Sequence, residues 1–144
     1  MNIEQLIKDS PDAIIVLDDQ DLVVYWNQGA TETFGYTEEE MMGKHLDNII
    51  PEKLRKRHTE AFLKYIETGK SKYERGHTMA VPATHKDGSR RSIEFRISAE
   101  VIHGQVKYVA AIVRDVTDKW NKNMEQIRRI KELEAQLREK EDSL

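Results

Sequence analysis

One histidine is placed where its side chain could do chemistry. His58 lies four residues after Leu54 and four before Phe62, on the same apolar stripe of a predicted helix as Tyr65 and Ile66. A neutral imidazole that points into a dry apolar space is a ligand for the iron of haem. A histidine on such a face can also be a core residue that hydrogen-bonds to a backbone carbonyl. The spacing therefore leaves both interpretations open.

Two further side chains could complete an iron site from the predicted strand region that begins at Tyr73. Met79 carries a thioether, a soft ligand that binds ferrous iron well, and is the candidate for the distal position. His77 lies two residues earlier on the same face and is the alternative ligand. We do not expect His77 to share a metal with His85, because eight strand residues span about 26 Å at ~3.3 Å each.

The composition argues against several other kinds of function. The chain has 144 residues and no cysteine, which rules out disulfides, Cys-ligated zinc or iron–sulfur clusters, thiol catalysis and cysteinyl photochemistry. A formal net charge of −3 lacks the basic surplus of a nucleic-acid-binding domain. Because no Gly-rich phosphate loop, kinase signature or cyclase signature occurs, we expect a regulatory module and no enzyme. Any catalytic output domain would lie outside this chain.

The hydropathy pattern favours a cytoplasmic module with no membrane contact. No apolar run approaches the ~20 residues that a membrane span requires. The N-terminal residues 1–9 include acidic side chains and no basic segment ahead of an apolar stretch, so they do not resemble a secretory signal.

The helices and strands that the sequence predicts around the candidate iron ligands indicate an α+β fold. Residues 13–17 and 22–26 are two short apolar runs around a polar turn, typical of a hairpin. A capping-box pattern at residues 37–40 starts a short helix, and a longer helix extends from Pro51 to near Gly69. Residues 90–101 then alternate between apolar and hydrophilic side chains, which indicates a half-buried antiparallel strand. Two strands, several helices and three further strands predict a five-stranded antiparallel sheet.

The last 27 residues, 118–144, contain no helix breaker and are predicted to form one long helix. Its apolar residues form two seams that are out of phase by one residue. The first seam is Trp120, Met124 and Ile127, and the second is Ile130, Leu133, Leu137 and Leu144. A lone helix this polar buries too little surface to be held in place, so we expect a parallel dimeric coiled coil.

Several motifs resemble those of the PAS sensor family. Residues 10–18 (SPDAIIVLD) resemble its first strand, and residues 24–36, with VYWNQGA and FGY, resemble its second strand and following helices. Residues 85–89 (HKDGS) match its late hairpin turn, and residues 114–117 (RDVT) match the motif that closes the domain. The resemblance implies a cup-shaped sheet with short helices over one face, and signal transmission through the terminal helices of a dimer.

A more specific resemblance concerns the ligand. The run of Arg55, Lys56 and Arg57 before His58, followed by Tyr65, resembles the helix that carries the proximal iron ligand in haem-binding PAS domains of oxygen-sensor kinases. This resemblance implies haem b, bound through His58 with Met79 or His77 on the distal side. The residues expected to contact the cofactor are Tyr65, Trp26, Ile93, Phe95 and Ile112. The alternatives are FAD, beside Trp26 and Asn27 as in flavin-binding relatives, or no ligand.

These patterns predict a sensor of three parts: an N-terminal cap helix at residues 1–10, a PAS domain at 11–117 and a signalling coiled coil at 118–144. The first hypothesis is a module that binds a small ligand, with haem for gas or redox sensing, and relays its state through the long helix. The second is a ligand-free PAS module for dimerisation and signal relay. In both, the homodimer forms through residues 118–144, with residues 2–8 as a second contact because Ile3, Leu6 and Ile7 are apolar.

Overall fold

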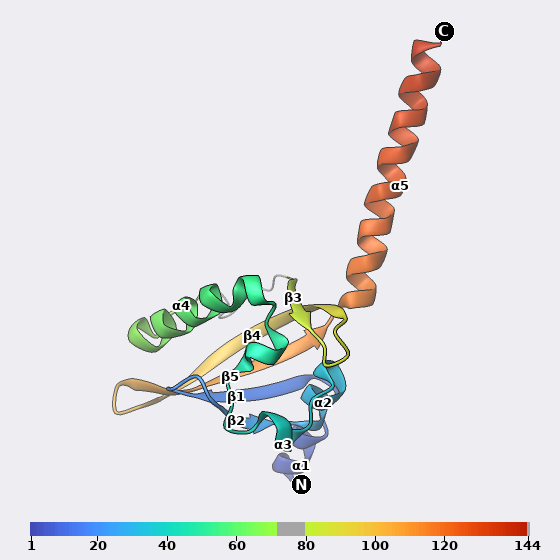
Figure 1. Cartoon of the computed structure of the whole chain (residues 1–144). Helices are drawn as coiled ribbons and strands as arrows, with labels where there is room; N and C mark the ends of the chain where they lie inside the picture. Colours follow the sequence, from blue (N-terminus) through green and yellow to red (C-terminus); the bar gives the residue numbers. More distant parts are fainter. Residues whose placement is uncertain (72–79, 144) are drawn as a thin grey trace.

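One antiparallel sheet organises the domain (Figure 1). The computed structural model describes residues 1–71 and 80–143. Within this part of the chain the sheet has five strands in the order β2-β1-β5-β4-β3. The strands are β1 (Ala13–Asp18), β2 (Val23–Trp26), β3 (Val81–Thr84), β4 (Arg90–Ile102) and β5 (Gln105–Asp115). The predicted α+β fold with a five-stranded antiparallel sheet is therefore confirmed.

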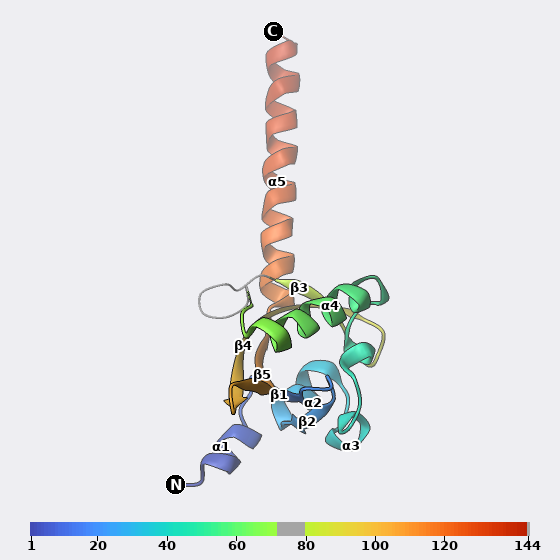
Figure 2. The same cartoon turned by 90° about the vertical axis from the view of Figure 1, so that its left-hand side faces the viewer.

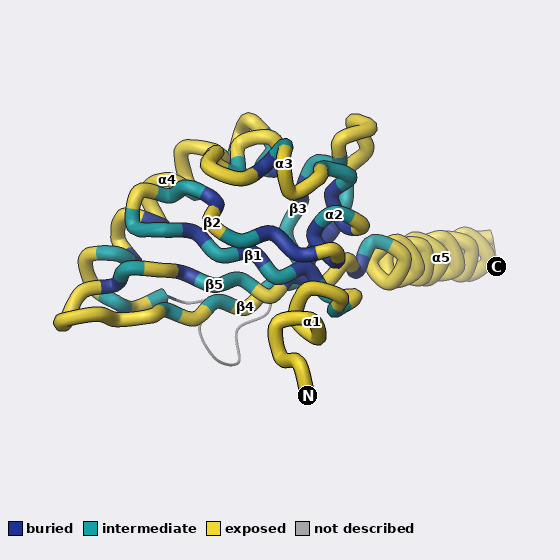
Figure 3. The backbone as a smooth tube through the Cα atoms, turned by 90° about the horizontal axis from the view of Figure 1, so that it is seen from below, coloured by how far each residue is buried: buried dark blue, intermediate teal, exposed yellow. Residues whose placement is uncertain are grey.

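The helices between β2 and β3 cover one face of the sheet (Figures 1 and 2). They are α2 (Gln28–Phe34), α3 (Glu38–Met41), the 3₁₀ helix η1 (Leu46–Ile49) and α4 (Glu52–Thr68). The two remaining helices are α1 (Ile3–Lys8) and α5 (Thr117–Asp142). Neither buries a side chain, and α5 extends away from the domain (Figure 3). None of the helices in the described ranges combines the length and the apolar character needed to cross a bilayer.

The strand register divides the sheet into an inner face, which the helices cover, and an outer face. Ala13, Ile15 and Leu17 of β1 are buried on the inner face, since side chains alternate along a strand. They pair in register with Val113, Ala111 and Val109 of β5, which in turn pair with Phe95, Ile97 and Ala99 of β4. The inner face is thus a continuous apolar surface across three strands.

The buried amide of Asn27 joins α1, β1 and α2. Its Oδ1 accepts hydrogen bonds from the backbone N–H groups of Ile14 (2.8 Å) and Ala30 (2.9 Å). Its Nδ2 donates to the carbonyls of Ile7 (2.9 Å) and Asp12 (3.0 Å). Asn27 therefore caps α2 and, at the same time, fixes the end of α1 and the start of β1.

The turn between β3 and β4 is anchored on the end of α2. Gly35 ends α2 with a φ of +83°, and the N–H of Lys86 donates to the carbonyl of Phe34 at 2.9 Å. The Lys86 ammonium donates to both carboxylate oxygens of Glu40, at 3.0 and 2.8 Å, and this hydrogen bonding holds the pKa of Glu40 below its usual value. The predicted capping box of Thr37 and Glu40 is also present, so this carboxylate stabilises α3 and the turn together.

We expect Asn27→Ala to reduce the free energy of unfolding by at least about 3 kcal/mol, because four backbone groups lose their partner and each buried unsatisfied group costs about 1–3 kcal/mol. Urea denaturation followed by circular dichroism measures the change. Asn48→Ala, at an exposed position, is the matched control and should change it by less than about 0.5 kcal/mol. Equal effects of the two substitutions would contradict the structural role of Asn27.

Candidate functional site

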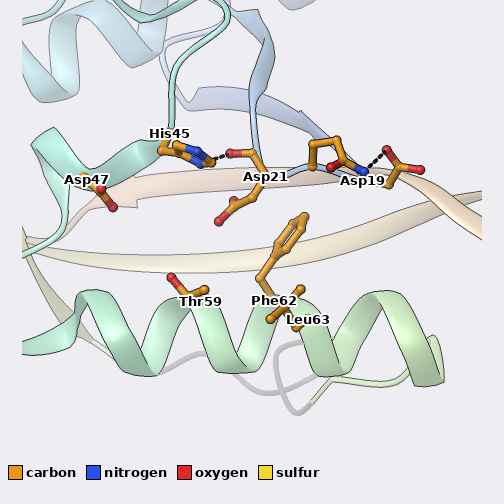
Figure 4. Close-up of a pocket in the computed structure, with 8 residues that line it drawn as sticks. Asp19, Asp21, His45, Asp47, Thr59, Phe62 and Leu63 are labelled. Atoms are coloured by element: carbon orange, nitrogen blue, oxygen red, sulfur yellow. Dashed lines mark hydrogen bonds between the residues drawn. The ribbon is translucent and has the colours of Figure 1, made fainter.

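Helix α4 lies over the inner face and turns its apolar stripe toward the sheet. Phe62 and Tyr65 are buried on this side of α4, and Ile66 packs against the same core. The close-up shows Phe62 pointing from α4 toward the strands (Figure 4). The orientation predicted from the spacing of the apolar residues is therefore present.

The apolar surface below α4 is less completely covered than the rest of the inner face. Ala13 and Ile15 of β1 are fully buried, whereas Ile97 of β4 and Ala111 of β5 are only half-buried. Since Ile15 and Ala111 pair directly across the two strands, coverage decreases from β1 toward β4. An apolar surface that α4 does not fully cover can receive an apolar ligand.

His58 lies on the sheet side of α4, next to the turn between β1 and β2. Its side chain is 29% exposed, and its ring stacks on Phe62 with 6.3 Å between ring centroids. Its Nε2 lies 3.5 Å from a carboxylate oxygen of Asp21. The imidazole is therefore partly screened from water, and its polar contact with Asp21, within the described part of the chain, is at the long end of the hydrogen-bond range.

Asp21 connects His58 to a second histidine. The carbonyl of Asp21 accepts a hydrogen bond from Nδ1 of His45 at 2.9 Å (Figure 4). Asp21 has a φ of +64°, in the left-handed region that aspartate adopts more readily than most residues. No motif in the sequence singles out Asp21, whose one sequence signal is its place in a polar turn of three aspartates and a glutamine.

An open pocket of about 410 Å³ lies beside these residues. Three parts of the chain form its walls: the β1–β2 turn, the segment at η1, and helix α4 (Figure 4). The walls carry carboxylates, an imidazole and two apolar side chains. The lining residues are Asp19, Gln20, Asp21, His45, Asp47, Thr59, Phe62 and Leu63. Six of the eight lining side chains are polar, whereas the surface under α4 is apolar.

The structure brings together some of the predicted cofactor contacts and separates others. Tyr65 lies on α4 with His58, and Ile93 and Phe95 lie on the inner face of β4. Trp26 is buried against Phe34, with ring centroids 5.8 Å apart. Its indole N–H donates to the Thr31 hydroxyl and the Tyr36 carbonyl, so the indole serves the packing of α2.

The prediction for Ile112 is wrong, because this side chain lies on the outer face. Ile112 pairs with Ile14 and Arg96, and it is 53% exposed. Its neighbour Val113 has the inner position. The continuous apolar run of β5 gave no alternation from which the two faces could be told apart. The predicted distal ligands, His77 and Met79, lie outside the described residues.

The donor set fits a metal that brings most of its own ligands. Among the described residues, no group of three or more His, Cys, Asp or Glu side chains is arranged to hold a metal ion. Haem iron needs only one or two axial protein ligands, since the porphyrin supplies the rest. His58 is one partly screened imidazole, with the ring of Phe62 stacked against it, and could supply one such ligand.

Residues 11–118 match the family model described as PAS domain. Curated relatives include the oxygen sensor protein DosP of Escherichia coli, 33% identical over 103 residues, which are 72% of this chain and 13% of DosP. The sensor protein FixL of Bradyrhizobium diazoefficiens is 25% identical over 136 residues, which are 94% of this chain and 26% of FixL. The match thus spans about an eighth of the length of DosP and about a quarter of the length of FixL.

Solved structures share the same fold. A PAS domain from Colwellia psychrerythraea has a TM-score of 0.67 at 24% identity, covering 80% of this chain and 94% of that one. An RNA-binding light–oxygen–voltage receptor has a TM-score of 0.71 at 23% identity, covering 87% of this chain and 36% of that one. A light–oxygen–voltage domain studied with a flavin analogue has a TM-score of 0.64 at 20% identity, covering 90% of this chain and 94% of that one. At these identities the likeness shows the fold alone.

Enlarging a side chain tests how completely α4 covers the sheet. We expect Ala111→Leu to reduce the free energy of unfolding by less than about 1 kcal/mol, because the half-buried site has room for three more carbons. Ala13→Leu, on the same face but fully buried, should cost about 1–3 kcal/mol or more. Chemical denaturation measures both. An Ala111→Leu cost as large as that of Ala13→Leu would mean that the surface under α4 is fully packed.

Proposed function

The chain belongs to the PAS domain family, and on this premise we propose that it binds a small ligand between α4 and the inner face and relays the ligand's state through a dimer of α5. The observation that carries the proposal is the position of His58, on the sheet side of α4 with its ring stacked on the buried Phe62. In this proposal the chain is a cytoplasmic regulatory module, and it performs no catalytic step itself.

Haem b is the ligand that the chemistry supports best. The imidazole of His58 can supply an axial ligand, and the partly covered side chains of Phe95, Ile97 and Ala111 offer an apolar surface to a porphyrin. A curated relative named as an oxygen sensor is in keeping with this choice. Bound haem would supply an iron that takes up a diatomic gas or changes its oxidation state.

The residues of the chain would each contribute to binding in a different way. His58 would provide a lone pair for the iron, and the stacked ring of Phe62 would restrict the motion of the imidazole. The buried side chains of Phe62 and Tyr65 keep water from this side of α4. Met79 and His77 remain the predicted distal ligands.

The start of α5 is hydrogen-bonded to β4, and this provides a route for the signal. The N–H of Val116 donates to the carbonyl of Ser92 at 2.8 Å, and the N–H of Ser92 donates to the Thr117 hydroxyl at 3.0 Å. Ser92 directly precedes Ile93, which lies on the inner face. A shift of β4 on ligand binding would therefore move the first turn of α5.

A dimer of α5 would bury apolar side chains that are exposed in the single chain. Along the two seams these side chains are 40–59% exposed, and no residue of α5 is buried. The described seam residues are Trp120, Met124, Ile127, Ile130, Leu133 and Leu137. A parallel coiled coil would bury them between two copies. The exposed Ile3, Leu6 and Ile7 of α1 offer a second contact in the same dimer.

The second candidate is a PAS module that relays signals without a ligand. It is favoured by the contacts of His58 with Asp21 and Phe62, which are sufficient for a core histidine. A flavin has less support. The indole of Trp26 and the amide of Asn27 already make hydrogen bonds within the protein, so neither has a free group for the ring.

Haem titration distinguishes the two candidates. We expect the purified protein to give a Soret band with a 1:1 end point when haem is added, and His58→Ala to lose this saturable band because the axial ligand is gone. His103→Ala, in an exposed turn, should bind haem with the same end point as the unchanged protein. If the unchanged protein shows no saturable band, the ligand-free relay is the better description.

We expect deletion of residues 118–144 to weaken the dimer at least about tenfold, because each copy loses its seams. Ile130→Lys in the full chain should also weaken the dimer. Gln136→Lys, away from the seams, should leave the dissociation constant unchanged. Sedimentation equilibrium measures the dissociation constants. A full-length chain that sediments as a monomer would rule out the proposed coiled coil.

A further inference from the structure

We infer that the open edge of β3 is a docking site for a short acidic segment of a partner protein, which binds along this edge as an extended strand. The inference does not depend on the ligand proposed under α4, because it uses a different pocket and other residues. Three features support it: a groove beside the edge, the free backbone groups of β3 and the charge of the groove.

A pocket that we name the β3 groove lies where the start of α4 meets β3 and the β3–β4 turn. Its volume is about 310 Å³, at the small end of the range for ligand pockets. This size suits a few side chains of a peptide segment better than a large cofactor. Half of the eight lining residues are apolar, namely Pro51, Leu54, Pro82 and Ala83. The groove thus offers apolar surface to alternate side chains of a strand bound at the edge.

Strand β3 is the last strand of the sheet and pairs with β4 on one side only (Figure 1). Along an antiparallel ladder, opposite pairs that exchange hydrogen bonds alternate with pairs that do not. The N–H of His85 donates to the carbonyl of Ser89 at 2.9 Å, so these two residues form a bonded pair. Thr84 comes next along the ladder, and its N–H and carbonyl therefore face the free edge.

The same alternation turns the carbonyl of Pro82 toward the free edge. Its opposite residue in β4 is Ser92, whose N–H donates to the Thr117 hydroxyl and whose carbonyl accepts from Val116. Because proline has no N–H, Thr84 is the residue of this pair that can both donate and accept. An incoming segment can therefore form only a few main-chain hydrogen bonds, which favours a short segment over the edge of a second sheet.

The charge of the β3 groove favours acidic side chains. Lys53 and Arg90 line it, and no aspartate or glutamate does. Neither cation forms an ion pair with another residue in the described part of the chain. Arg57 follows Lys53 by one turn on the same side of α4 and continues the positive charge along the helix. A segment that carries carboxylates is the complementary partner for this surface.

The first test titrates the full chain into a fluorescein-labelled peptide of seven residues in which aspartate alternates with valine. Fluorescence anisotropy measures the dissociation constant. We expect saturable binding, and at least about fivefold weaker binding of a control peptide with asparagine in place of aspartate, since the exposed ion pairs are lost. If the aspartate peptide shows no saturable binding, the proposed docking site is wrong.

Two charge reversals on β4 locate the peptide. Arg90→Glu changes a residue of the groove, and Arg96→Glu makes the same change at an exposed position of the same strand outside the groove. We expect Arg90→Glu to weaken binding about fivefold or more, and Arg96→Glu to leave the dissociation constant within about twofold. Equal weakening by both would indicate a general attraction of anions and overturn the inference.

Hydrogen exchange followed by NMR tests the strand itself. Saturating peptide should slow the exchange of the Thr84 N–H about tenfold or more, because this group gains a hydrogen bond. The N–H of Ala83, which faces β4, should exchange at an unchanged rate. Peptide binding without protection of Thr84 would overturn the strand docking. If the chain alone protects Thr84 as its concentration increases, the occupant is a second copy and the proposed partner is wrong.

Discussion

The arrangement of the domain depends on the hydrogen bonds of the buried Asn27 side chain. Its four hydrogen bonds fix the end of α1, the first residues of β1 and the start of α2 at one point. Gly29 allows this close approach, because a Cβ there would lie 2.3 Å from the carbonyl oxygen of Asp12. From this point β1 pairs with β2 and β5, and the turn that follows β1 carries Asp21.

The candidate site combines elements held by different forces. Helix α4 is held over the sheet by burial of Phe62 and Tyr65, which is a hydrophobic contribution without directional preference. The β1–β2 turn is held by hydrogen bonds, which are directional and fix Asp21 and His45 relative to each other. The two segments meet at His58, whose ring contacts Phe62 of the helix and Asp21 of the turn.

Local signals in the sequence predicted much of the fold. Pro51 and Gly69 flank α4, Thr37 and Glu40 form the capping box, and the alternation along β4 places Phe95 on the covered face. Each of these features depends on side chains within a few residues of one another or on the pleat of one strand, so the sequence contains the information. The apolar stripe of α4 similarly predicted that His58 and Phe62 share a face.

The faces of buried strands and the partners of polar groups were decided by the tertiary structure. Ile112 lies in a run of apolar residues, where periodicity cannot separate the inner face from the outer face. Its place in the strand pairing and its exposure put it on the outer face. The contact between Asp21 and His58 joins residues 37 positions apart, and it exists because β1 and α4 are brought together by a shared core. By itself the sequence determined the elements and the orientation of α4. The structure decided which side chains meet, because contacts between distant segments follow from packing, which no local pattern encodes.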